Sequence, residues 1–427
     1  MAVLLLGAVA LCPGAAADGL RQAGTPQDVF GQPMAGVNSA VLAKFNYGLG
    51  LFRHARDPQS HADGTISGIG PLHNARSCVA CHIRDGRGAP PDWRVDDTIS
   101  IVFNLVGPTD GDPIYGAQIQ DRAVDGLRPE GKPGVRWIDV RVALGSDETL
   151  ILRRPEWVLD DLGDGPLEAD TAIDARVAPQ LVGMGLLEAV DPATIAALAD
   201  PDDRDGDGIS GRTAGAGQQL GRFGWRATAP SLAAQTEKAA HYDMGLRVPG
   251  YDWPGGDCTV AQTACLARAA DSGLDLSATD IALIGIYLSH LEVPARRDSD
   301  KPQVREGQAL FGQLGCAACH VAQLRTGAST APDLAHRDIA PYTDLLLHDM
   351  GPGLAGPAGA EWRTPPLWGI GLTQQVSGHN YLLHDGRARG FVEAIVWHGG
   401  EAQAARDGFA RLSSSERAAL IAFLASL

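Results

Sequence analysis

The chain has 427 residues and a mass of 44.7 kDa, which exceeds the length of one ordinary domain. Apolar residues make up 44% of it and charged residues 20%, so it can bury a core and is not globally disordered. The 53 glycines and 27 prolines indicate a loop-rich protein. A formal net charge of −16 disfavours nucleic acid and anionic membranes as partners and favours a basic partner.

The first segment has the pattern of a targeting signal. Residues 2–17 form a short apolar run that ends in small residues. This pattern predicts a signal peptide over residues 1–17, cleaved after Ala17, and a periplasmic or otherwise exported protein. Lipid attachment at Cys12 is disfavoured, because Leu11 is too large for the position before a lipidated cysteine. No later stretch reaches the roughly 18 apolar residues that a membrane helix needs, so no transmembrane segment is expected in the mature chain.

Six of the seven cysteines fall into three pairs, and a histidine directly follows two of the pairs. The two resulting Cys-x-x-Cys-His motifs consist of Cys78, Cys81 and His82, and of Cys316, Cys319 and His320. In this pattern the thiols attach to the vinyl groups of a haem, and the histidine binds its iron as proximal ligand. This composition gives about 0.003 such motifs by chance, so the two motifs predict two covalently bound haem c groups. A thiol redox pair or a zinc site would not explain both histidines.

The third pair, Cys258 and Cys265, has no following histidine. In an oxidising compartment it predicts a local disulfide. A free or regulatory thiol pair is the alternative.

Three elements recur in the same order, which indicates an internal duplication. Besides the cysteine–histidine motif, they are a P-x-L-x-G-x-G-L motif at 179–186 and 365–372 and a capped amphipathic helix at 276–291 and 412–427. The number of residues that separates the two copies decreases from the first element to the third, so the first unit holds insertions. One insertion contains the alternating segment 137–144, which predicts short strands.

The duplication predicts a mainly α-helical fold of two cytochrome c-like domains, the first of them enlarged by loop-rich insertions and short β-strands. The expected divisions are an N-terminal extension at 18–70, a first haem domain at 71–294, a linker at 295–302 and a second haem domain at 303–427.

An acidic loop in the second insertion is a candidate metal site. Asp203, Asp205, Asp207 and Gly208 match the pattern D-x-D-x-D-G, in which alternating carboxylates on a tight turn collect hard oxygen ligands for calcium. The twelfth position of the pattern is Ala214 and not glutamate, so the full calcium loop is absent. A solvated Asp-Gly loop without a metal is the alternative.

Two further segments carry a family resemblance: RTPPLWGIGL at 363–372 and YLLHDGRARGFVEAIVWHGGEA at 381–402. With them the chain resembles the bacterial di-haem cytochrome c peroxidases. The segments RVAPQLVGMGLLEAV, DRDGDGISGR and GRFGWRA make it most similar to the di-haem oxidoreductase branch of that superfamily. The resemblance covers roughly residues 45–427.

The resemblance implies roles for individual histidines. His82 and His320 match the proximal ligands of the two haems. The position that holds the sixth ligand of the second haem in the family, counted from His384, is occupied by His398. We therefore expect His398 to be the distal ligand of the second haem, although a helix-end histidine bound to carbonyls or to a propionate is the alternative. Ligation by two histidines would give a lower potential than the His/Met pair of the family.

The first haem has several candidate ligands. The family carries a distal glutamate after the proline motif, and Glu188 takes that place as the acid–base residue for peroxide cleavage. A surface glutamate is its alternative. No histidine lies between His82 and His241, so the distal histidine of the family is missing or replaced. Met244, His241 and Met184 remain candidates for the sixth ligand, each against a role in the hydrophobic core.

Other side chains are expected near the haems. His384 is expected to hold a propionate or to lie on the path between the haems, and His348 and Met350 are alternative ligands. Arg363 and Arg387 are expected to pair with propionates.

Together these residues predict a peroxidase-type oxidoreductase. Electrons from a small soluble donor, a cytochrome c or a cupredoxin, would enter at the C-terminal haem and reduce peroxide, or another small oxidant, at the N-terminal haem. One alternative is a non-enzymatic di-haem electron carrier, in which Met244, His241 or Met184 ligates the first haem. Another is an oxidase of a thiol or of a partner protein's side chain.

Overall fold

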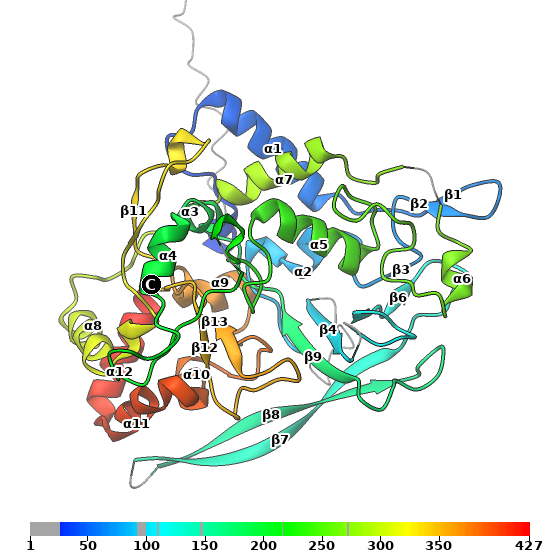
Figure 1. Cartoon of the computed structure of the whole chain (residues 1–427). Helices are drawn as coiled ribbons and strands as arrows, with labels where there is room; N and C mark the ends of the chain where they lie inside the picture. Colours follow the sequence, from blue (N-terminus) through cyan, green and yellow to red (C-terminus); the bar gives the residue numbers. More distant parts are fainter. Residues whose placement is uncertain (1–25, 92–99, 109–110, 146–147, 216, 271–272) are drawn as a thin grey trace, which may run out of the picture.

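The computed structural model describes residues 26–91, 100–108, 111–145, 148–215, 217–270 and 273–427 (Figure 1). The predicted signal peptide, with Cys12, lies outside the described residues. Within those ranges no helix has the length and apolar character that crossing a membrane would require.

The helices are short, and all of them except α1 and α2 follow residue 183. Their bounds are α1 Ser39–Arg53, α2 Cys78–Cys81, α3 Met184–Glu188, α4 Pro192–Leu198, α5 Leu232–Met244, α6 Thr263–Leu266, α7 Ala278–Ser289, α8 Pro302–Gln313, α9 Thr373–Ser377, α10 Phe391–Trp397, α11 Gln403–Arg411 and α12 Ser414–Ser426.

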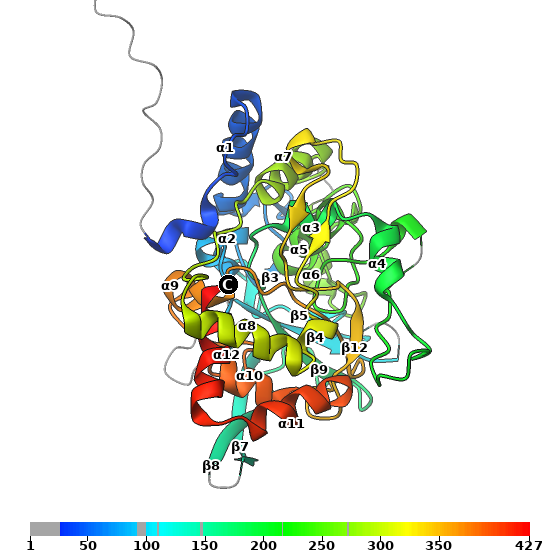
Figure 2. The same cartoon turned by 90° about the vertical axis from the view of Figure 1, so that its left-hand side faces the viewer.

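Two pairs of crossing helices repeat the same contact: α1 with α7, and α8 with α12 (Figures 1 and 2). A glycine allows the close approach in each pair. A Cβ atom on Gly48 of α1 would collide with the carbonyl oxygen of Leu283, and one on Gly307 of α8 would collide with that of Ala419. The duplication in the sequence therefore corresponds to a duplicated helix pair. Because α1 lies in the segment predicted as an N-terminal extension, this segment contributes a helix to the first pair.

The last helix of each pair begins at the predicted cap. Ser277 caps α7 and Ser413 caps α12, and each accepts a hydrogen bond from the backbone N–H three residues on. Asp280 and Glu416 complete the two capping boxes by bonding back to the cap residue. The predicted repeat of the capped helix is confirmed.

The described strands form six small sheets. Their bounds are β1 Gln59–Ser60, β2 Ile66–Ser67, β3 Leu72–His73, β4 Ile101–Val106, β5 Gln118–Ile119, β6 Arg122–Ala123, β7 Lys132–Leu144, β8 Glu148–Asp160, β9 Ala172–Val177, β10 Leu324–Arg325, β11 Asp338–Ile339, β12 Leu347–Asp349 and β13 Glu361–Arg363. The largest elements are an antiparallel ribbon of β7 and β8, paired from Lys132–Asp160 to Leu144–Glu148, and an antiparallel sheet in the order β5-β4-β9.

The predicted fold class, mainly α-helical with two cytochrome c-like domains, is therefore wrong. The β7–β8 ribbon is long, and the β5-β4-β9 sheet is not a peripheral insertion in the first predicted domain. In β4, Ile101, Phe103 and Leu105 alternate inward, and they join Phe311 and Phe423 of the second helix pair in one hydrophobic core. β4 thus buries its apolar side chains in the same core as the C-terminal helices.

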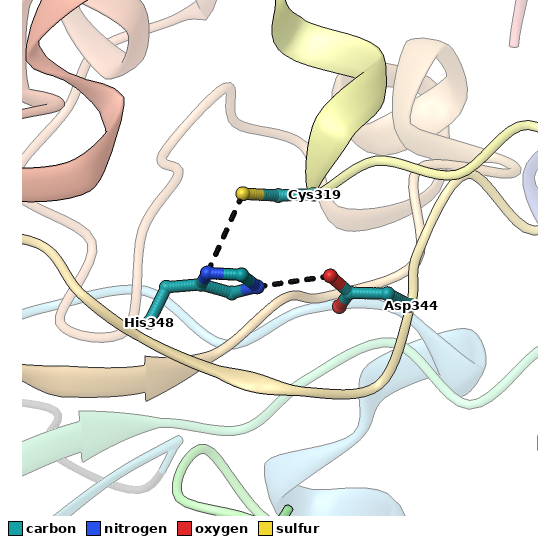
Figure 3. A group of neighbouring side chains, drawn as sticks. All are labelled: Cys319, Asp344 and His348. Atoms are coloured by element: carbon teal, nitrogen blue, oxygen red, sulfur yellow. Dashed lines mark hydrogen bonds and ion pairs between the residues drawn. The ribbon is translucent and has the colours of Figure 1, made fainter. Parts of the chain in front are cut away.

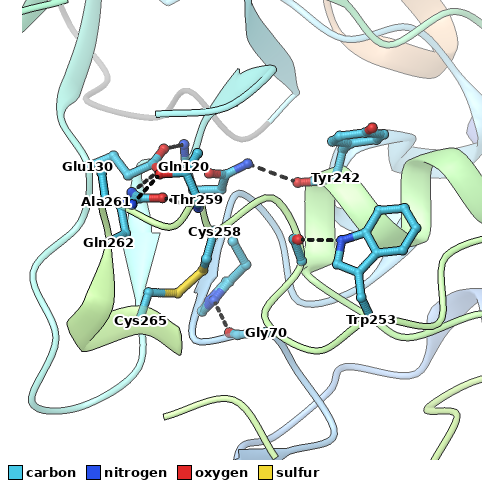
Figure 4. Close-up of a disulfide and its surroundings, with 12 residues drawn as sticks. Gly70, Gln120, Glu130, Tyr242, Trp253, Cys258, Thr259, Ala261, Gln262 and Cys265 are labelled. Carbon is cyan, nitrogen blue, oxygen red and sulfur yellow. Dashed lines mark hydrogen bonds between the residues drawn. A yellow bond between two sulfur atoms is a disulfide. The ribbon is translucent and has the colours of Figure 1, made fainter. Parts of the chain in front are cut away.

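A separate hydrophobic core lies between α1, α5 and α7. It also takes in the C-terminal residues Trp368 and Val376, so the chain crosses between the two cores more than once. Cys258 and Cys265 are joined by a disulfide beside the start of α6, with their Cα atoms 6.2 Å apart (Figure 4).

Candidate functional site

Both Cys-x-x-Cys-His motifs open onto one cavity of about 890 Å³. The first motif lies on α2 below the crossing of α1 and α7, and the second follows α8 directly. The cavity reaches from one motif to the other and is lined largely by apolar side chains of both cores. A cavity of this size with mostly apolar walls is typical of a site for a large, mostly apolar cofactor.

The first histidine is held as a metal ligand would be. His82 lines the cavity, and its Nδ1 donates to the carbonyl oxygen of Pro179 at 2.9 Å. A carbonyl only accepts, so this bond leaves Nε2 without a proton and with a free lone pair. Burial lowers the pKa of His82 to about 4, which keeps the ring neutral.

The second histidine has the same arrangement. The Nδ1 of His320 donates to the carbonyl oxygen of Tyr342 at 2.9 Å, and burial lowers the pKa of His320 to about 4. An aromatic ring accompanies each histidine: Phe52 of α1 lies 6.3 Å from His82, and Phe311 of α8 lies 6.3 Å from His320, measured between ring centres. The two halves of the cavity are thus built alike.

The four motif cysteines are free thiols in the structure. Burial raises the pKa of Cys78 and of Cys316 to about 11, and it also raises the pKa of Cys81 and Cys319. A reactive redox thiol needs a lowered pKa, because the thiolate is the active form. The environment therefore disfavours a redox dithiol. Neutral imidazoles with free lone pairs beside buried or half-buried thiols in a mostly apolar cavity fit haem.

His398 lines the cavity on the side of the second motif. It follows α10, and its Nδ1 donates to the carbonyl oxygen of Ala394 at 2.6 Å. Burial lowers the pKa of His398, and the ring is close enough to His320 to lower the pKa of that residue further. The structure thus brings His398 and His320 into the same half of the cavity, each with Nε2 free.

The candidates for the first haem separate into two groups. Met184 of α3 and Met244 of α5 are both buried and both line the cavity. His241 is fully buried and is absent from the lining, because its ring lies among aromatic side chains and its Nδ1 donates to the carbonyl oxygen of Leu246 at 3.2 Å. Geometry therefore favours a methionine over His241.

Glu188 does not reach the cavity. Its Oε1 accepts the backbone N–H of Leu232 at 2.8 Å, at the start of α5, and its carbonyl oxygen accepts a bond from Arg222. The carboxylate therefore stabilises a helix end, and the predicted acid–base role has no geometric support.

A carboxyl group that the sequence reasoning missed does line the cavity. Asp243 lies near the first motif, accepts a bond from the Nε2 of Gln118 at 2.9 Å, and has its pKa raised to about 6 by burial. In the sequence, its position directly before Met244, a candidate ligand of the first haem, could have indicated that Asp243 lies near this haem.

Cationic side chains also reach the cavity. Arg87, Arg176, Lys238 and Arg363 line it, and burial lowers the pKa of Arg363 to about 10. These groups could pair with the propionates of haem. Arg387, the other predicted partner, is absent from the lining and instead forms an ion pair with Asp385 at 2.7 Å.

His384 lies in the cavity wall and stacks on Trp362, with ring centres 3.6 Å apart and an angle of 12° between the planes. Burial lowers its pKa to about 4. The arrangement suits a neutral ring packed beside a cofactor.

His348 is held between two carboxylates. Its Nε2 lies 2.9 Å from Asp344, and its Nδ1 lies 3.6 Å from the Sγ of Cys319 (Figure 3). The same Nδ1 lies 2.6 Å from Glu401. Hydrogen bonds to these neighbours raise the pKa of His348 to about 12, although burial acts against them. Both ring nitrogens of His348 are thus engaged by carboxylates, and His348 lies as a clamp beside the second motif. Met350 lines the cavity nearby.

The structure gathers the three predicted calcium ligands. One oxygen each of Asp203, Asp205 and Asp207 lies within 4.8 Å of the others. The turn is closed by backbone N–H groups that donate to these carboxylates, for example Gly208 to Asp203 at 3.1 Å.

Comparison with known proteins agrees with the donor set. The family model described as di-haem oxidoreductase, putative peroxidase, matches residues 13–103 and 160–427. The unmatched stretch, 104–159, includes nearly all of the β7–β8 ribbon. No curated protein matches the chain. Among solved structures, hydrazine synthase from Kuenenia stuttgartiensis, pressurised with xenon, is 14% identical over 100% of this chain and 98% of its own, with a TM-score of 0.36.

The family match extends over both cysteine–histidine motifs and over the C-terminal segment that ends at Leu427. On this evidence the chain belongs to the di-haem oxidoreductase family.

Proposed function

We propose that the protein is an exported c-type di-haem oxidoreductase that reduces hydrogen peroxide with electrons from a small soluble redox protein. One observation carries the proposal: two matched sets of a neutral histidine and two free thiols open onto a single cavity. When bound through these thiols, each haem would supply an iron that cycles between two oxidation states, and one of them would reduce peroxide. The family description supports a haem oxidoreductase, and peroxide as the oxidant is our inference from it.

The chain's own residues would divide the work between the two halves of the cavity. His320 and His398 would hold the second haem from two sides and make it an electron-transfer site. In the first half the candidate sixth ligands are thioethers, which bind iron less firmly than a second imidazole and can leave a position open to a small oxidant. Asp243 is the carboxyl group in that half which can exchange a proton with a bound ligand.

The electron donor is inferred from charge and size. The net charge of −16 favours a basic partner, since complementary charges speed the encounter of two proteins. We therefore propose a small basic cytochrome or a cupredoxin as the donor.

The proposal includes two further elements. The signal-like segment at 1–17 supports export to the periplasm, where covalent haem attachment takes place in bacteria. The three carboxylates of the acidic loop support calcium binding, because hard oxygen ligands suit this ion. Calorimetric titration with calcium, repeated on an Asp205→Ala variant, tests the loop. Binding by the wild type alone supports a calcium site there, and absence of binding heat with both proteins contradicts it.

The haem content is tested by a pyridine haemochrome spectrum of the exported protein. We expect two haem c groups per chain, and one in a variant with Cys78→Ala and Cys81→Ala. Loss of both haems on acid acetone extraction of the wild type would contradict covalent attachment. Peroxide consumption is then followed with a reduced basic cytochrome c as donor, and absence of turnover by protein with both haems would contradict the peroxidase assignment.

An electron carrier is the second candidate function. The observation in its favour is that Met184 and Met244 both line the cavity near the first motif. If one of them ligates the first haem in every oxidation state, both haems are closed to peroxide. Electron paramagnetic resonance of the oxidised and half-reduced protein separates the two functions, because only a peroxidase needs a high-spin ferric signal in one of these states.

A further inference from the structure

A cluster of four rings lies beside the first half of the cavity. It consists of His241 and Tyr242 at the end of α5 and of Tyr251 and Trp253 in the loop that follows. Ring centres are separated by 4.7 Å from Trp253 to His241, 5.0 Å from His241 to Tyr242, 5.3 Å from Trp253 to Tyr251, and 5.6 Å from Tyr251 to Tyr242. Aromatic rings at these separations are in direct contact.

The cluster joins the cavity to the protein surface. Tyr242 lines the cavity at its inner end. Trp253, at the outer end of the cluster, is 47% exposed. The other tryptophans that the structure describes are buried or half-buried. Figure 4 shows Tyr242 and Trp253 on the same side of the disulfide. The indole nitrogen of Trp253 donates to the carbonyl oxygen of Gly256 at 3.2 Å.

The loop geometry holds the outer rings in place. Val248 and Tyr251 exchange two backbone hydrogen bonds of 2.9 Å, which close a tight turn before Trp253. His241 stacks on Tyr251 with an angle of 17° between the ring planes. Every ring therefore has a fixed neighbour on the way from the surface to the cavity.

We propose that Trp253, Tyr251 and Tyr242 form an electron-transfer port through which the first haem site oxidises donors that are too large to enter the cavity. This inference rests on the proposed function. Indole and phenol are the side chains that lose a single electron most readily, and the contact between Tyr251 and Tyr242 makes the route continuous without the less oxidisable ring of His241.

The electrons and protons balance as follows. Each donor at the surface loses one electron to Trp253, which passes one electron inward through Tyr251 and Tyr242. Two such transfers, with two protons from water, convert one hydrogen peroxide into two water molecules in the cavity. The donor class is a one-electron reductant of protein size, and the port differs from entry at the second haem in using side chains of the first.

Direct measurement of electron transfer tests the port without peroxide. A ruthenium bipyridine label is placed on Asp252→Cys, which is exposed and directly precedes Trp253, in the haem-loaded, reduced protein. A flash excites the label, which loses one electron to an added electron-accepting quencher, and loss of ferrous haem absorbance then gives the rate at which an electron moves outward to the oxidised label. Trp253→Phe keeps an aromatic ring but is hard to oxidise, so we expect it to slow this rate about tenfold. An equal rate in both proteins overturns the port.

Tyr47→Phe is the matched control. Tyr47 is 60% exposed on α1, and the structure records no ring contact for it. We expect its substitution to leave the rate unchanged, and a slowing as large as that of Trp253→Phe would overturn the assigned route.

A second measurement uses peroxide without a donor. We expect peptide mass spectrometry to find oxygen added to Trp253, and this product to fall in a Tyr242→Phe variant because the inner link is broken. Oxidation of Trp253 that is unaffected by Tyr242→Phe would overturn the route. A protein that passes the flash test but consumes no peroxide would retain the port and contradict only the proposed peroxidase function.

Discussion

His320 and His398 line the same half of the cavity, and each donates its Nδ1 hydrogen to a backbone carbonyl, at 2.9 Å to Tyr342 and at 2.6 Å to Ala394. The two bonds fix both rings as tautomers with Nε2 free. The free Nε2 atoms support the proposal that the two imidazoles hold one iron. Spectra of His398 variants separate this role from that of a helix-end histidine that binds only a carbonyl.

Removal of His398 is expected to open the second haem. In His398→Ala the haem should keep His320 and lose its sixth ligand, so a new high-spin ferric signal should appear in the electron paramagnetic resonance spectrum. His398→Met should restore a low-spin haem and raise its reduction potential, because a thioether favours the ferrous state. His379→Ala is the control, since His379 is bound to the carbonyl of Arg87 and does not line the cavity. An unchanged spectrum of His398→Ala would show that another residue is the ligand.

The close approach of α1 and α7 gives a stability prediction. Gly48→Ala places a methyl group against the carbonyl of Leu283, and overpacking of this kind costs about 1–3 kcal/mol. Gly50→Ala on the same helix meets nothing within 4 Å, so it should be neutral or stabilise by roughly 0.5–1 kcal/mol. Denaturant unfolding of the two variants measures the difference. Equal stability of both would mean that the helices do not cross at Gly48.

The acid–base assignment leads to a paired test. Asp243→Asn keeps the shape and the bond from Gln118 but cannot exchange a proton, so peroxide turnover should fall while haem content stays at two. Glu188→Gln replaces a carboxylate that accepts the backbone N–H at the start of α5 and does not line the cavity, so turnover should persist. Kinetics at saturating donor compares the two variants, and the reverse order of effects would restore Glu188 as the catalytic group.

The sequence predicted the local features of this fold well. The capping boxes at Ser277 and Ser413 and the alternation in 137–144 are short-range patterns, and each appears as expected. The residues of each cysteine–histidine motif also lie together, as residues of a five-residue motif do in any fold, whereas the cavity that the two motifs share is a long-range feature.

Long-range packing was beyond the sequence. Nothing in the alternation of β4 says that Phe103 packs in the core with Phe423, more than three hundred residues away along the chain. The carboxylate of Glu188 points to the backbone N–H of Leu232, at the start of α5. The motif around Glu188 does not indicate where α5 begins, so this orientation could not be predicted from it. The repeat pointed to two separate domains, whereas both hydrophobic cores take residues from both halves of the chain.

The clamp around His348 predicts how stability changes with pH. The pKa of His348 is raised to about 12 from an ordinary 6.5, so its contribution is fully present below 6.5 and is lost as the pH rises towards 12. The pKa of Glu401 is lowered to about 2 from 4.5, so its contribution is present above 4.5 and is lost as the pH falls towards 2. His348→Gln should lower the melting temperature most near pH 6. The gap to the wild type should narrow at pH 10, and a gap that widens there would contradict a charged His348.

The disulfide is expected to stabilise one wall of the cavity. It joins two cysteines seven positions apart in the chain. In the chain-entropy model, closing a loop of this size stabilises the folded state by about 2.5 kcal/mol. Asp257, next to Cys258, accepts the backbone N–H groups of Ala117 and Gln118 at 2.7 and 2.9 Å, and Gln118 in turn holds Asp243.

A variant with Cys258→Ala and Cys265→Ala should therefore lose about 2 kcal/mol of unfolding free energy. It should also exchange the amide hydrogens of Ala117 and Gln118 faster than the wild type, because Asp257 no longer has a fixed neighbour. Hydrogen exchange followed by mass spectrometry resolves this segment, and the helix α12 serves as the internal reference. Faster exchange throughout the protein would indicate a global loss of stability, whereas faster exchange confined to this segment would place the effect of the disulfide at the cavity wall.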